Sequence, residues 1–135
     1  MTGAATVLAF DFGTRRIGVA VGTTITRSAR ALATIDASDR DALARVIGEW
    51  QPQLLVVGLP VHADGTPHAM TERARRFGDD VSKRFGIPVE YADERHTSEL
   101  ARTALAGQGR DGRRRRDEVA AQIILQGWLD DNATA

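Results

Sequence analysis

The sequence contains no cysteine. Disulfide bonds and metal sites built on thiolate ligands are therefore both excluded, and a cytoplasmic location is the simplest expectation. Long apolar runs are absent as well, because no run approaches the ~18 residues that a membrane-spanning helix needs. The first five residues also lack the basic stretch and apolar core of a signal peptide. We therefore expect no membrane as a partner.

Neither sign of charge is in excess, since 18 basic residues balance 18 acidic ones. A globally basic nucleic-acid-binding protein is therefore not indicated. Every basic residue except Lys83 is arginine, whose planar guanidinium suits phosphate, although genome composition can produce the same bias. Aromatic residues make up only 5% of the chain, so base stacking cannot be the main mode of any nucleic-acid recognition.

The length of 135 residues, with 42% hydrophobic and 27% charged residues, is typical of one soluble globular domain. Apolar and β-branched runs predict five strands, at residues 7–10, 16–22, 29–35, 54–58 and 87–92. Apolar spacing and capping residues predict four helices: one after Ser38, one after Thr66, one from about Thr97 to Ala106, and one from about Arg115 to Leu129. Between the last two helices, we expect residues 107–116 to form a mobile basic loop, and residues 131–135 to fray.

The order of these elements predicts an α/β fold. Three opening strands can form an antiparallel meander, whereas the later strands alternate with helices and so pair in parallel. A mixed five-stranded sheet with helices on both faces follows. In such sheets, ligand sites usually lie at the carboxyl ends of the strands, where acidic residues fall in this sequence.

Asp11 ends the first predicted strand, on the face that carries Val7 and Ala9. It is a candidate catalytic residue, and a turn aspartate that bonds its own backbone near Gly13 is an equally good interpretation. Asp93 and Glu94 end the fifth predicted strand. They point to opposite faces, so at most one of them should join Asp11, and alternation alone does not say which.

Asp117 lies at the start of the last predicted helix, on the apolar stripe that continues through Ala120, Ala121 and Ile124. The helix dipole also favours an acidic residue in the first turn, but it does not explain this alignment with the packed face. Glu118 heads the neighbouring stripe and is the poorer candidate. Three carboxylates at one site would repel each other unless a hard divalent cation offset them, and such ions support phosphodiester hydrolysis.

Four ordered segments resemble the YqgF/RuvX family of bacterial proteins. They are residues 11–22 (DFGTRRIGVAVG), 56–60 (VVGLP) followed by Asp64-Gly65, 93–98 (DERHTS), and Asp117 with the apolar residues of its helix. Together they span nearly the whole chain. The resemblance implies a single ribonuclease H-like domain over residues 1–135. It further implies an endonuclease that matures the 5′ end of pre-16S rRNA, or a Holliday junction resolvase.

The same resemblance implies Asp11, Glu94 and Asp117 as metal-binding catalytic carboxylates, with Asp93 as the alternative to Glu94, and Mg²⁺ or Mn²⁺ as cofactor. His96 departs from the family pattern, in which an apolar residue is usual at that position. Basic residues flank the expected site and could bind the phosphates of structured RNA or branched DNA: Arg15, Arg16, Arg110, Arg113, Arg114, Arg115 and Arg116. We interpret Arg73, Arg75 and Arg76 as a solvated helix face.

Other functions stay open from the sequence. A non-catalytic nucleic-acid-binding factor with the same fold would bind without cleaving. Residues 11–14 also resemble the phosphate loop of actin-like kinases, but those proteins close two lobes around ATP, and 135 residues supply only one. Paired cuts in a four-way junction would need a symmetric dimer, whereas RNA processing is compatible with a monomer or a homodimer.

Overall fold

A computed structural model describes residues 5–60, 66, 69–93 and 111–132, with side chains of the last segment from residue 116 onward. Five strands form one sheet in the spatial order β3-β2-β1-β4-β5. They are β1 (Thr6–Phe12), β2 (Arg16–Thr23), β3 (Ala29–Asp36), β4 (Leu54–Leu59) and β5 (Val89–Asp93). The first three are antiparallel neighbours, and β4 and β5 run parallel to β1. The predicted mixed sheet is therefore confirmed.

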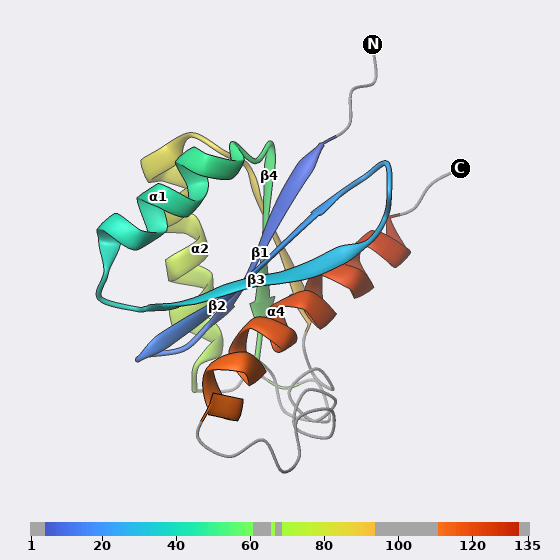
Figure 1. The fold of residues 1–135 in the computed structure, drawn as a ribbon. Helices are drawn as coiled ribbons and strands as arrows, with labels where there is room; N and C mark the ends of the chain where they lie inside the picture. The colour runs from blue at the N-terminus through green and yellow to red at the C-terminus, as the bar shows by residue number, and fades with distance from the viewer. Residues whose placement is uncertain (1–4, 61–65, 67–68, 94–110, 133–135) are drawn as a thin grey trace.

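Helices cover both faces of this sheet (Figure 1). Helices α1 (Arg40–Trp50) and α2 (Thr71–Phe85) pack on one face, and α4 (Asp111–Asp131) crosses the other. The prediction of helices on both faces is confirmed. The helix predicted at residues 97–106 lies outside the described residues. None of the described helices is long and apolar enough to cross a membrane.

The helix ends differ from the predicted ones in detail. Asp39, not Ser38, caps α1, because its Oδ1 accepts a hydrogen bond of 2.9 Å from the Ala42 amide. Helix α2 begins at Thr71, several residues after Thr66. Helix α4 begins at Asp111, so residues 111–116 of the segment predicted to be a mobile loop are helical. Arginine is a good helix former, and a run of it extends a helix as readily as it forms a loop.

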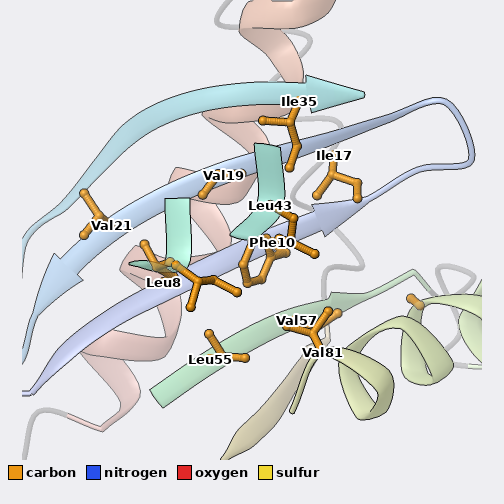
Figure 2. Packing of buried hydrophobic residues seen from close by; sticks show 12 residues of the cluster. Leu8, Phe10, Ile17, Val19, Val21, Ile35, Leu43, Leu55, Val57 and Val81 are labelled. Atoms are coloured by element: carbon orange, nitrogen blue, oxygen red, sulfur yellow. The ribbon is translucent and has the colours of Figure 1, made fainter. Parts of the chain in front are cut away.

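Large apolar side chains fill the space between the sheet and helices α1 and α2 (Figure 2). Leu8, Phe10 and Val57 are fully buried there, and Leu43 of α1 and Val81 of α2 close over them. These strand residues alternate with the ones that face α4, as the period of two in a strand requires. This core fixes the α1 and α2 layer to the sheet.

Beneath α4, β2 carries much smaller residues, beside Val7 of β1 and Val56 of β4. Gly18, Ala20 and Gly22 of β2 lie under the helix, where Ala121 and Leu125 are fully buried. A Cβ atom at Gly22 would lie 3.1 Å from a Leu129 methyl group. Because these positions carry so little side chain, α4 lies directly on the backbone of β2.

Candidate active site

Asp11 and the second turn of α4 meet at one edge of the sheet. Asp117 was predicted at the start of the last helix, but α4 begins six residues earlier, at Asp111. Asp11 pairs with Gly18 across the antiparallel β1–β2 ladder, and paired residues send their side chains to the same face. At Gly18 that side is occupied by α4, because a Cβ atom there would lie 1.9 Å from the carbonyl oxygen of Asp117. The fold thus brings Asp11 and Asp117, from opposite ends of the chain, to the same face and the same edge.

Asp117 is held by an ion pair from the second strand. The Nε of Arg16 donates a hydrogen bond of 2.7 Å to Oδ2 of Asp117, and both side chains are partly buried. Arg16 lies two residues before Gly18 on β2 and therefore shares its face. The sequence predicted Arg16 to bind nucleic-acid phosphate, and this contact with a candidate carboxylate was not foreseen.

Glu118 and Asp93 have different surroundings from Asp117. Glu118 accepts a hydrogen bond of 3.3 Å from the Thr34 hydroxyl and so is turned toward β3. Asp93 pairs with Leu59, and the same alternation places Val57 and Tyr91 in the core beneath α2. Asp93 therefore belongs to the face opposite Asp11. Glu94 lies outside the described residues.

The predicted arginines are described only in part. Arg15 is exposed in the β1–β2 turn, where its carbonyl oxygen accepts a hydrogen bond of 2.8 Å from the Ala37 amide. The Nε of Arg116 is buried and has no hydrogen-bond partner in the part of the chain that the structure describes. Residues 113–115 belong to α4, their side chains are not described, and Arg110 lies outside the described residues.

The donor chemistry of this edge fits a hard divalent cation. Asp11 and Asp117 supply carboxylate oxygens on one face, and Mg²⁺ typically binds through one or two carboxylates together with water and substrate phosphate. Among the described residues, no three acidic or histidine side chains gather into a group that could hold a metal ion. The third predicted donor, Glu94, belongs to the segment that is not described.

The ordering of the sheet and the placement of α4 define the class of fold. Thermus thermophilus RuvC, solved in complex with a Holliday junction substrate, matches with a TM-score of 0.55 over 96% of this chain and 97% of that chain. A second Thermus thermophilus RuvC structure gives the same TM-score over 93% and 95%. Both are 14% identical to this chain, so they show the fold alone. The fold that this chain shares with them is the ribonuclease H-like fold.

A family model described as "RuvX: Holliday junction resolvase" matches residues 5–131. The chain belongs to this RuvX family, as its motifs predicted. A relative from Dechloromonas aromatica (strain RCB) is 51% identical over 132 residues, covering 93% of this chain and 90% of the relative. One from Burkholderia cenocepacia (strain HI2424) is 50% identical over 133 residues, covering 93% and 89%. Both are named "Putative pre-16S rRNA nuclease".

Proposed function

We propose that this protein is a divalent-metal-dependent endonuclease that cleaves phosphodiester bonds during 5′-end processing of pre-16S rRNA. The convergence of Asp11 and Asp117 on one face at one sheet edge is the observation that carries the proposal. The names of the relatives from Dechloromonas and Burkholderia favour RNA processing as the setting.

We assign Asp11, Glu94 and Asp117 as the carboxylates that hold Mg²⁺ or Mn²⁺. Glu94 is preferred to Asp93 because the resemblance of residues 93–98 to the family motif implies it, and because Asp93 pairs with Leu59 on the α2 face. A bound divalent cation would supply the charge that activates a water molecule and stabilises the leaving oxygen of the phosphodiester. The carboxylates of this chain orient that ion.

The arginines then have two tasks in the proposal. Arg16 holds Asp117 in place through the 2.7 Å ion pair. Arg15, exposed beside Asp11, binds the phosphate that precedes or follows the scissile one. We extend the same phosphate-binding role to Arg110 and to Arg113, Arg114, Arg115 and Arg116, which lead along the chain to Asp117.

The test is cleavage of a pre-16S rRNA leader by the parent protein and by Asp11→Asn and Asp117→Asn variants, with Mg²⁺, with Mn²⁺ and with a chelator. Glu118→Gln is the matched control. It removes the same charge from the residue next to Asp117 on α4, whose side chain is turned toward Thr34. We expect metal-dependent cleavage that both aspartate variants abolish and the control retains. Circular dichroism checks that every variant is folded. Equal cleavage by the parent and both aspartate variants would refute the assigned site.

Resolution of four-way DNA junctions is the second candidate, favoured by the description of the matching family model. The same assay includes a four-way junction beside the RNA, and light scattering measures whether the protein is a monomer or a dimer. Symmetric paired cuts by a dimer would favour the resolvase. Binding of either substrate without metal-dependent cleavage would instead identify a non-catalytic factor.

A further inference from the structure

A cavity of about 510 Å³ lies on the sheet face opposite α4. Its walls include Phe12 and Thr14 from the end of β1, Ser38 before α1, and Arg73, Arg76 and Phe77 of α2. It is a shallow cavity that is open to solvent, so an extended chain can lie across it. The proposed catalytic site does not use any of these residues.

The cavity lies at the same edge of the sheet as Asp11. Phe12 follows Asp11 directly, so their Cα atoms are about 3.8 Å apart while their side chains face opposite ways. The α2 side of the cavity belongs to this edge too, because the Thr71 hydroxyl at the start of α2 donates a hydrogen bond to the Pro60 carbonyl just after β4. A strand of nucleic acid that crosses the edge can therefore reach both places.

Two arginines give the described walls of this cavity a net positive charge. Arg73 and Arg76 are exposed, and neither makes an ion pair or hydrogen bond within the described part of the chain. Arg75 is different, because its guanidinium lies 5.3 Å above the Tyr91 ring. Among the described wall residues, Asp80 is the one acidic side chain, and it balances one of the two charges at most. Free guanidinium groups of this kind bind phosphate oxygens in pairs of parallel hydrogen bonds.

The same cavity presents an aromatic surface. Phe12 and Phe77 stack with ring centroids 4.9 Å apart and an angle of 30° between the planes, and both are only partly buried. Thr14 and Ser38 also line the cavity, and each carries a hydroxyl group that can donate and accept hydrogen bonds. Aromatic rings beside arginine are the usual means of binding single-stranded nucleic acid without reading its sequence.

We propose that this cavity binds an unpaired nucleotide of the substrate strand, with its phosphate on Arg73 and Arg76 and its base against Phe12 and Phe77. The proposal rests on the proposed nuclease function, and it adds a requirement for single-stranded substrate beside the cleaved bond. One base-binding pocket is compatible with the low aromatic content, which excludes only extensive stacking.

The first test measures binding without cleavage. Fluorescence anisotropy follows a labelled, uridine-rich RNA of about 12 nucleotides, and a DNA of matching sequence, in the presence of a chelator. The variant is Arg73→Ala/Arg76→Ala. The matched control is Arg45→Ala/Lys83→Ala, which removes the same charge from α1 and α2 at exposed residues outside the cavity.

We expect the cavity variant to bind the strand roughly tenfold more weakly than the parent. The slope of log K against log salt concentration should also be shallower by about 1.4, the value expected for the loss of two phosphate contacts on a single strand. The control should change binding less than about twofold. Parent-like binding and salt dependence in the cavity variant would overturn the cavity proposal alone. Failure of the parent protein to bind any strand would overturn the proposed function as well.

The second test locates the base. Irradiation of the parent bound to a strand with 5-iodouracil should give a cross-link to Phe12 or Phe77, identified by mass spectrometry. Phe77→Leu keeps most of the apolar volume but removes the ring, and we expect binding about fivefold weaker. The melting temperature should fall because the ring contacts with Phe10 and Phe12 are lost, so circular dichroism checks that the variant is folded at the assay temperature. Cross-links confined to other peptides would overturn the assignment. Binding of polyglutamate is measured for the same proteins. The proposal would also be overturned if Arg73→Ala/Arg76→Ala lost polyglutamate binding but kept strand binding, because that outcome identifies an acidic protein partner.

Discussion

The two faces of the sheet are packed in different ways. Beneath α4 the strands present glycine and alanine on β2, beside Val7 of β1 and Val56 of β4, and the helix approaches so closely that the Asp117 carbonyl occupies the place of a Gly18 side chain. Beneath α1 and α2 they present leucine, valine and phenylalanine, which hold the helices away from the backbone. Hydrogen bonds also hold α4, since Gln126 accepts one from the Ala29 amide and donates one to the Arg27 carbonyl, each of 2.9 Å.

This difference explains where the two proposed sites lie. Helix α4 packs directly on the backbone of β2 and is held by hydrogen bonds, so its position relative to the sheet is tightly fixed. Such a fixed position suits carboxylates that must share a cation. A helix that rests on large side chains leaves room between elements, and the cavity beside Arg73 and Phe77 occupies such room. Added atoms on β2 beneath α4 should therefore be destabilising, and so should the removal of large core side chains beneath α1 and α2.

The largest expected effect is on the bulky face. Phe10→Ala removes a fully buried ring that packs edge-on against Phe77, with the ring centroids 5.6 Å apart. We therefore expect a loss of about 3–5 kcal/mol in the free energy of unfolding. Urea denaturation followed by circular dichroism measures it. Ile25→Ala, at a side chain that is 71% exposed, should stay within about 0.5 kcal/mol of the parent. Similar losses in both variants would remove the basis for the comparison.

On the close-packed face the damaging change is an addition. Gly18→Ala places a methyl group against the Asp117 backbone, so α4 must shift, and we expect a loss of about 1–3 kcal/mol. Gly127→Ala, on α4 itself, is the control, because nothing lies within 4 Å of the added Cβ atom. It should raise stability by up to about 1 kcal/mol through helix propensity. If Gly18→Ala were as stable as the parent, the close contact would not position α4.

Tyr91 supplies a polar anchor on the α2 face, and its contribution depends on pH. Burial, together with a hydrogen bond from its hydroxyl to Asp79, raises the pKa of Tyr91 well above its ordinary value of 10.0. Because the folded state holds this proton more tightly than the unfolded state, the stabilisation is present at neutral pH and is lost as the pH rises above 10.

Tyr91→Phe should therefore cost about 1 kcal/mol at neutral pH. Its stability should approach that of the parent in alkaline solution, where the parent loses the contribution of this hydroxyl. Thermal unfolding followed across neutral and alkaline pH measures both parts of the prediction. A constant difference between the two proteins at every pH would show that the hydroxyl does not titrate in this way.

The smallest expected effect is at the ion pair between Arg16 and Asp117. Both side chains are partly exposed, at 34% and 23%, so Arg16→Ala should lower stability by less than about 1 kcal/mol. High salt should reduce that loss further by screening the charges. Arg16→Lys, which keeps the charge, separates electrostatics from geometry. A loss comparable to that of Gly18→Ala would show that charge, rather than close packing, holds α4.

The sequence predicted much of the local structure because local patterns carry it. Continuous apolar runs at 7–10 and 54–58 are typical of buried strands, and both are strands with fully buried residues. Gly86 ends the second helix with a left-handed φ of 67°, a conformation that glycine adopts more readily than other residues. The start of α4 was placed too late, because nothing local distinguishes a helical arginine run from a loop.

The amino-acid sequence by itself determined the order of strands and helices, the α4 stripe below Asp117 and membership of the RuvX family, because periodicity and ordered motifs need no distant partner. Tertiary structure alone decided that Arg16 reaches Asp117, that Gly18 receives the backbone of α4, that Asp93 belongs to the opposite face from Asp11, and that Arg73 and Arg76 border a cavity. Each of these depends on where elements far apart in the chain cross, and no local pattern encodes that crossing.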